Sequence, residues 1–425
     1  MPRGEPGMIV IPPTPDRKPP AKPPRPKLEI VKSKTVEKPV ELLQDDLIEE
    51  PDEMELSAEE VMEVREPGEL QEKDVEEAFV IRGFKGLEVA ATLEKKDERK
   101  NKPENRNQDN VILDPETGLI GVLDGLGGEG AGDLASKGAE QVIPERFAQA
   151  LKDAPKSQAE VQRALVDQQL RKLGASSPEL AAQQRVQVTK MIEGMQMKDP
   201  AMARKALALM EAISASNEAV KETGGKTTAC VGFIHEAPDG SRWAVVANVG
   251  DSAAYKRRAN GEMVPLTKED SLLNRMTDTG EMSPELLAQL KKEPDKKFPI
   301  PVTLDLIRAA GGTEKDYEKA KGNTIPMSYK KLKVTMVGAL GSSNPEPSLA
   351  IRRLDKGDEL IMGTDGLVDK FEDPATEDTN LAELSRASSA GTTQTERMNA
   401  LRREAKTRKT YKEDDDVAIV SARVA

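Results

Sequence analysis

The chain has 425 residues, with 63 Lys and Arg against 75 Asp and Glu, a net charge of -12 and a pI near 5.1. This acidic balance disfavours nucleic acid as a partner, because such affinity comes mainly from neutralising phosphates. The single histidine and single cysteine nearly exclude His and Cys zinc sites, Ser-His-Asp triads and Cys-His nucleophiles.

The N-terminal part of the chain predicts neither a signal peptide nor a membrane partner. Its apolar run at residues 8–11 is too short to insert into a bilayer, and no stretch of about 18 apolar residues follows. A single cysteine permits no intrachain disulfide, which fits a reducing compartment. We therefore expect a cytoplasmic protein.

Residues 1–76 predict a disordered tail that is first proline-rich and then acidic. Residues 1–30 hold ten of the 29 prolines, and residues 44–76 are dominated by Asp and Glu. Such segments bury too little apolar surface to offset the entropy of the chain. The tail is a candidate interaction arm for a protein partner, and residues 77–425 predict one globular domain.

The predicted domain mixes strands with long helices. Residues 79–92 indicate opening strands, and residues 131–153 have helical spacing, as does a second block from Ser157 to about Val220. Strands then dominate residues 227–266. Residues 271–333 are polar and helical in pattern, which predicts a flap-like insertion.

Four aspartates are predicted at strand ends: Asp124, Asp251, Asp365 and Asp415. Three of them lie beside glycine after apolar runs, and Asp415 precedes such a run. If these ends meet, the carboxylates cannot all stay ionised without a cation among them. Oxygen ligands suit magnesium, manganese or calcium.

Two other site classes compete for the first of these aspartates. Gly125, Gly127 and Gly130 satisfy the G-x-G-x-x-G dinucleotide fingerprint. However, Asp124 would lie beside the bound pyrophosphate, and no short βαβ unit follows. A haloacid-dehalogenase-type phosphatase needs a second aspartate where Leu126 stands, so we expect neither class.

The lone histidine and cysteine predict structural roles. Cys230 lies in an apolar run and is expected to be a small buried hydrophobe. His235 ends the same run beside Glu236, and we expect it to face solvent at the end of a strand.

The order and the sequences of eight segments resemble those of the metal-dependent Ser/Thr protein phosphatases of type 2C, the PPM family. These segments are NRNQDN (105–110), LDGLGGEGAGDLAS (123–136), GGKTTA (224–229), VANVGDSAAY (246–255), LTKEDS (266–271), ALGSS (339–343), GDELIMGTDGLVD (357–369) and DDDVAIV (414–420). The resemblance implies an α+β fold: a four-layer α-β-β-α sandwich of two antiparallel sheets flanked by helices, with metals at one end.

The resemblance also implies a role for each matching residue. Asp124 corresponds to the carboxylate that bridges two Mg²⁺ or Mn²⁺ ions, with the carbonyl of Gly125 as a further ligand. Asp365 and Asp415 correspond to the other ligands of the first metal, and Asp251 with Asp365 to the site of a third, weaker metal. Asp109 corresponds to the acidic residue that orients the attacking water.

Several positions depart from the family pattern. Gln108 stands where many members have glutamate, which predicts a weaker second metal. Glu104 occupies the position of the basic residue that grips the substrate phosphate, so Arg106, or Arg99 from the same loop, is the candidate replacement. In addition, Leu126 stands where some members have a histidine, and Ala253 replaces a frequent arginine.

These observations predict a magnesium- or manganese-dependent phosphatase that hydrolyses phosphoserine and phosphothreonine in proteins through a water activated by a binuclear centre. Two alternatives stay open. One is a catalytically weak or inactive relative that binds a phosphoprotein or a partner. The other is a hydrolase of a small phosphomonoester.

Overall fold

The computed structural model describes residues 64–65, 79–81, 84, 86–94, 107–127, 130–173, 177–310, 312–342, 345–372, 379–408 and 415–424. The chain divides into two units, Met1–Ala58 and Glu59–Ala425, and every described residue belongs to the second unit. Of the predicted tail, only Val64–Arg65 is described. Its disorder and the boundary at residue 76 stay predictions.

The first sheet has seven strands, and apart from its first pair all neighbours run antiparallel. The parallel pair is β1 and β2, so β1 joins the sheet from within the predicted tail. In spatial order the strands are β1 (Val64–Arg65), β2 (Phe79–Ile81), β3 (Leu87–Glu94), β15 (Val417–Val424), β14 (Glu359–Gly363), β9 (Ala253–Arg257) and β10 (Met263–Pro265).

The second sheet is antiparallel throughout. Its order is β13 (Ser348–Leu354), β8 (Arg242–Val249), β7 (Ala229–Glu236), β5 (Leu119–Leu126) and β4 (Asp109–Asp114), and the short β6 (Lys226–Thr227) pairs with the end of β5.

The two sheets pack face to face. Successive residues of the central strands point to opposite faces, and those on both faces are apolar. In β5, Ile120 and Val122 belong to the cluster between the sheets, whereas Leu119 and Leu123 belong to the cluster under the helices. This alternation is the two-residue period of a strand. Every central strand is therefore buried on both sides.

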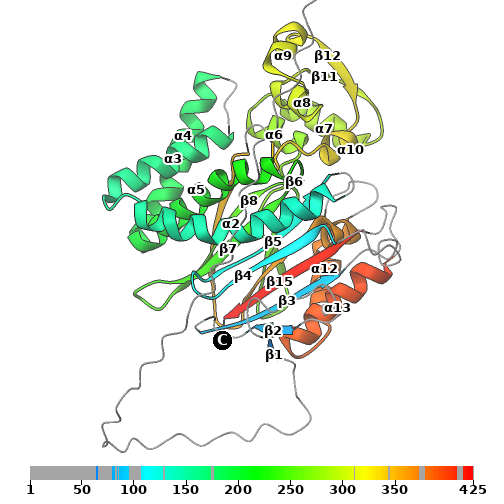
Figure 1. The fold of residues 1–425 in the computed structure, drawn as a ribbon. Helices are drawn as coiled ribbons and strands as arrows, with labels where there is room; N and C mark the ends of the chain where they lie inside the picture. The colour runs from blue at the N-terminus through cyan, green and yellow to red at the C-terminus, as the bar shows by residue number, and fades with distance from the viewer. Residues whose placement is uncertain are drawn as a thin grey trace, which may run out of the picture. The chain divides into compact units, whose positions relative to one another are not determined.

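Helices cover the outer faces of both sheets (Figure 1). α2 (Ala131–Asp153), α3 (Gln158–Leu173), α4 (Pro178–Lys198) and α5 (Pro200–Glu222) share one hydrophobic cluster with the second sheet. α12 (Leu381–Ser388) and α13 (Gln394–Thr407) share another with the first sheet. These layers confirm the predicted α+β, four-layer α-β-β-α sandwich.

Residues 272–334 form a lobe with its own hydrophobic cluster, which holds Leu272, Ile300 and Tyr329. Its elements are α6 (Leu272–Asp278), α7 (Pro284–Lys292), β11 (Phe298–Pro301), α8 (Leu304–Ala309), α9 (Glu314–Ala320), β12 (Thr324–Met327) and α10 (Tyr329–Val334). The helical pattern missed the antiparallel β11–β12 pair, whose prolines are tolerated because a two-stranded sheet has only edges. A role as a flap stays a prediction.

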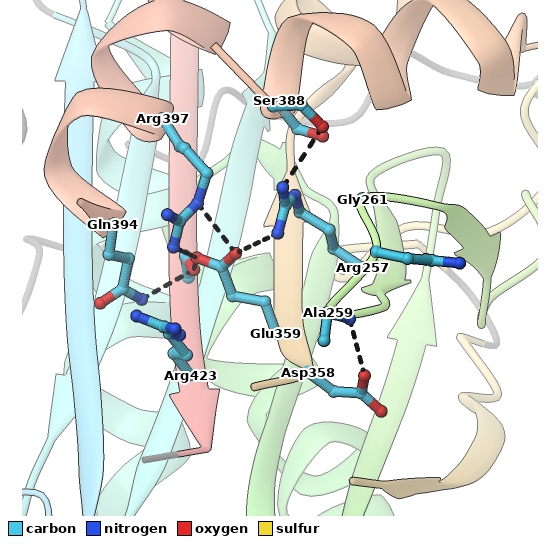
Figure 2. A network of polar contacts seen from close by, with 12 residues as sticks. Arg257, Ala259, Gly261, Asp358, Glu359, Ser388, Gln394, Arg397 and Arg423 are labelled. Atoms are coloured by element: carbon cyan, nitrogen blue, oxygen red, sulfur yellow. Dashed lines mark hydrogen bonds and ion pairs between the residues drawn. The ribbon is translucent and has the colours of Figure 1, made fainter. Parts of the chain in front are cut away.

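A buried carboxylate fixes the C-terminal helices on the first sheet (Figure 2). Glu359 of β14 is 1% exposed and accepts hydrogen bonds from Arg397 Nε and Nη2, both at 3.3 Å, while Arg257 Nη1 lies 3.5 Å away. Ser421 Oγ also donates to Glu359, at 2.9 Å. Because buried charges require such partners, this network ties α13 to β9, β14 and β15.

The lone histidine does not face solvent, so that expectation is wrong. His235 is buried, and its Nε2 lies 2.5 Å from Oδ2 of Asp199, which caps the start of α5. The carboxylate of Asp199 is the buried partner of the His235 ring, a contact between α5 and β7 that the sequence pattern did not reveal. Cys230 is fully buried, as predicted, and burial raises the pKa of its thiol.

No helix in the described ranges is long and apolar enough to span a bilayer.

Candidate active site

Two of the predicted site aspartates lie opposite each other in the second sheet. β4 begins at Asp109, and this residue pairs in register with Asp124 near the end of β5. Both side chains are buried, at 4% and 6% exposure. The pairing arises because β4 and β5 form an antiparallel hairpin, which brings the start of one strand beside the end of the other.

The other predicted aspartates lie at the matching end of the first sheet. Asp365 follows β14 and opens α11 (Asp365–Val368), and Asp415 precedes β15, the antiparallel neighbour of β14. Asp251 lies two residues before Ala253, which pairs with Gly363 at the end of β14. The register therefore places all three at one end of the sheet.

Asp416 is an acidic residue of this cluster that the sequence prediction left out. It is 1% exposed, and its Oδ2 accepts a 2.8 Å hydrogen bond from the backbone N–H of Gln108. Asp415, by contrast, is exposed at the same strand entry. The sequence did mark Asp416 as a candidate, since it is the last carboxylate before an apolar strand. Periodicity alone, however, cannot tell whether Asp415 or Asp416 is the buried one.

Close backbone contacts require glycine at two positions of the site. A Cβ atom on Gly125 would lie 2.2 Å from the carbonyl oxygen of Gly132, and one on Gly366 would lie 1.9 Å from that of Asp416. Any side chain at either position would push these segments apart. Gly125 therefore allows the end of β5 to pack against the start of α2, and Gly366 allows the segments that carry Asp365 and Asp416 to meet.

Burial and like charge shift the ionisation of these carboxyl groups. The pKa of Asp109, Asp124 and Asp365 is raised well above the usual range, first by burial and then by neighbouring aspartates. For Asp109 the strongest such neighbour is Asp416, and a hydrogen bond from Thr364 acts in the opposite direction. Carboxylates gathered in this way repel one another when they are ionised.

The donor chemistry of the cluster fits hard divalent cations. Asp124 Oδ2 is buried and has no hydrogen-bond partner among the described residues. Its surroundings supply carboxylate and carbonyl oxygens, the ligands that Mg²⁺ and Mn²⁺ prefer. Within the described ranges, however, no three His, Cys, Asp or Glu side chains are arranged to hold one ion. The ligand assignments therefore stay predictions.

The predicted phosphate grip lies outside the described residues. Arg99, Glu104 and Arg106 all fall in residues 95–106, so the role of Arg106 is untested. Among the other departures from the family pattern, the side chain of Gln108 donates from Nε2 to the carbonyl of Gly127, at 3.2 Å. This bond orients the amide along the loop that follows Asp124.

A buried ion pair supports the backbone before Asp251. Lys172 Nζ at the end of α3 lies 2.5 Å from the carboxylate of Asp270. Asp270 in turn accepts from the N–H of Gly250, at 3.1 Å, and donates its own N–H to the carbonyl of Gly250, at 2.9 Å. Through these contacts α3 helps to position the residue that precedes Asp251.

Glu269 makes the stability of the folded protein depend on pH, and this dependence can be tested. Its pKa is raised to about 7, chiefly by burial, although Lys333 opposes the shift. The unfolded chain releases this proton near pH 4.3 and the folded chain near 7, so folding loses stability as the pH rises between these values. Glu269→Gln should therefore melt increasingly above the parent protein from pH 5 to pH 8. A constant difference in Tm across this range would contradict the shift.

Comparisons with known proteins agree with the resemblance in the part of the chain that carries Asp365 and Asp415. The family model of stage II sporulation protein E (SpoIIE), which describes a domain like the type 2C phosphatases, matches residues 330–425. No curated protein sequence matches the chain.

Several solved structures are similar to this chain. The serine/threonine phosphatase of S. agalactiae is 18% identical, with 80% of this chain and 100% of that chain covered, at a TM-score of 0.43. PstP/Ppp of Mycobacterium tuberculosis is 18% identical, with 80% and 98% covered, at a TM-score of 0.41. RsbX in complex with magnesium is 11% identical, with 82% and 100% covered, at a TM-score of 0.39.

The sequence segments, the two-sheet sandwich and the family model thus point to one class, the PPM-type phosphatase fold.

Proposed function

We propose that this chain is a divalent-metal-dependent protein phosphatase that acts on phosphoserine and phosphothreonine. The observation that carries the proposal is the convergence of buried carboxylates at the strand ends, led by the facing pair Asp109 and Asp124. An anionic phosphoester approaches such a cluster only when cations offset its charge. A phosphoryl-transfer site with bound divalent ions meets that requirement.

In this proposal Asp124, Asp365 and Asp415, with the carbonyl of Gly125, hold two Mg²⁺ or Mn²⁺ ions. Asp251 with Asp365 holds a third. Such ions lower the pKa of water and offset the charge that develops on phosphoryl oxygens. Asp416 supports the cluster by orienting the backbone at Gln108.

Asp109 is proposed to handle the proton of the attacking water. Thr364 Oγ1 donates to Asp109 Oδ2 at 2.7 Å, and the N–H of Ala418 donates to Thr364 Oγ1 at 3.0 Å, which fixes the orientation of the carboxyl group. Oδ1 is then the oxygen that receives the proton.

Hydrolysis of two substrates tests the proposal against its alternatives. With Mn²⁺, the full chain should release phosphate from both para-nitrophenyl phosphate and a phosphothreonine peptide. Turnover of the small substrate alone would indicate a small phosphomonoester as the natural one. Turnover of neither would favour a phosphoprotein-binding relative, the alternative that Glu104 and Gln108 suggest.

The phosphate grip gives a separate prediction. If Arg106 replaces the missing basic residue, Arg106→Ala should raise KM and lower kcat, with a loss of roughly 2–4 kcal/mol in transition-state stabilisation and intact metal binding. Arg99→Ala is the parallel variant. Parent-like kinetics in both variants would exclude this loop as the grip.

The cytoplasmic location and the tail as an arm for a protein partner are part of the same proposal. Both rest on the composition of the chain.

A further inference from the structure

A cavity of about 310 Å³ and a larger one of about 540 Å³ both border the 272–334 lobe. The larger one lies beside the candidate active site, because Lys226 of β6 lines it and pairs in register with Leu126, two residues beyond Asp124. Its other walls come from the end of α3, the start of α8 and the loop at residues 336–342. We call it the β6 cavity.

The β6 cavity carries an excess of positive charge. Four basic residues line it against three acidic ones: Arg171, Lys226, Arg275 and Arg308 against Glu281, Asp305 and Glu346. Arg171 pairs with Glu346 at 3.4 Å, whereas Arg275 and Arg308 share Asp305 at 3.6 and 4.0 Å. Lys226 makes no ion pair with any described residue, and both Lys226 and Arg308 are exposed. Lys226 thus remains available to a ligand, and the exposed Arg308 is held only by the long pair with Asp305, while Glu281 accepts a 3.0 Å hydrogen bond from Thr279.

Hydrogen bonds hold the loop at residues 336–342 against β6. Leu340 and Thr227 exchange two backbone hydrogen bonds, at 2.8 and 3.1 Å. Asn217 of α5 accepts from the N–H of Gly341 at 2.7 Å and donates to the carbonyl of Ser342 at 3.1 Å. Because these contacts fix the loop against β6, Lys226 projects from a supported strand and not from a mobile segment.

From this geometry we infer that the β6 cavity is a subsite for a second anionic group of the phosphoprotein substrate. This inference rests on the proposed function, since it assigns the scissile phosphate to the neighbouring carboxylate cluster. The group is a carboxylate or a second phosphate a few residues from the scissile one. Lys226 and Arg308 would form charge-assisted hydrogen bonds to it.

Peptide binding tests the subsite without turnover. Three peptides of equal length, with neutral flanks, with added glutamates or with a second phosphothreonine mimic, carry a non-hydrolysable phosphonate in place of phosphothreonine and are titrated against the full chain with saturating Mn²⁺ by fluorescence anisotropy. The anionic peptides should bind roughly tenfold more tightly than the neutral one. Tighter binding of the doubly phosphorylated peptide alone identifies phosphate as the ligand. Equal affinities of the two anionic peptides, both tighter than the neutral one, show that either anion is accepted.

Variants assign that preference to the cavity. Lys226→Gln and Arg308→Gln should each remove most of the tenfold preference. Lys152→Gln, an exposed lysine in the last turn of α2, should keep it. Equal affinity of the parent for all three peptides, or an undiminished preference in both cavity variants, would overturn the inference.

The two proposals fail in distinguishable ways. Absence of Mn²⁺-dependent hydrolysis by the parent, with the peptide preference intact, would reject the phosphatase activity and leave an anion-binding cavity. Hydrolysis of para-nitrophenyl phosphate by the parent, with no preference among peptides, would reject the subsite and leave the activity.

Discussion

Asp124→Asn and Asp365→Asn are each expected to lower phosphatase turnover by at least roughly a hundredfold, because each removes a charged ligand from the proposed metal cluster. The readout is phosphate release from a phosphothreonine peptide with saturating Mn²⁺. Asp153→Asn, at the exposed end of α2, is the matched control and should behave like the parent. Parent-like turnover in either cluster variant would remove that residue from the site.

The same two substitutions should raise the stability of the protein in EDTA. Burial and neighbouring aspartates raise the pKa of both carboxyl groups, so their ionised forms are unfavourable at neutral pH. An amide of nearly the same shape relieves that repulsion. A higher Tm together with lost turnover is the signature of a functional charge cluster, whereas a lower Tm would indicate that the carboxylates serve folding.

Loss of the Lys172 ammonium is the second large effect that we expect. Lys172→Met keeps most of the side-chain length but leaves Asp270 buried without its cation, which costs about 3–5 kcal/mol of unfolding free energy. Burial lowers the pKa of Lys172, and Asp270 is the carboxylate that most strongly opposes that shift. Urea titration measures the loss.

A double variant separates the ion pair from simple packing. Lys172→Met with Asp270→Asn removes both charges while an amide oxygen can still accept from the N–H of Gly250. The double variant should therefore recover much of the stability that the single variant loses. A strictly additive loss would show that the pair contributes no coupling.

The fold was predictable to the extent that local patterns and motif order define it. Apolar runs that end in Asp and Gly, and the helical spacing of residues 131–153, correspond to observed elements. The antiparallel β11–β12 pair was missed, because short strands with prolines lack the alternation that marks a strand. The burial of His235 was missed as well, since its partner Asp199 is 36 residues away in the sequence.

The candidate site was predictable where glycine and aspartate follow an apolar run. That pattern identified Asp124, whereas Asp109 was identified only through the family resemblance. Neither could give the strand register that places the two residues opposite each other. The pattern also could not distinguish buried Asp416 from exposed Asp415, because both precede the same strand. The Lys172–Asp270 pair joins residues 98 apart, which no local pattern reveals.

An anomalous diffraction map of crystals grown with Mn²⁺, collected at the manganese absorption edge, shows directly whether the carboxylate cluster binds metal. We expect peaks in contact with the carboxylates of Asp124 and Asp365, and their loss in Asp124→Asn crystals. A map with no anomalous peak at these carboxylates, from protein that hydrolyses phosphothreonine peptides in solution, would contradict this expectation.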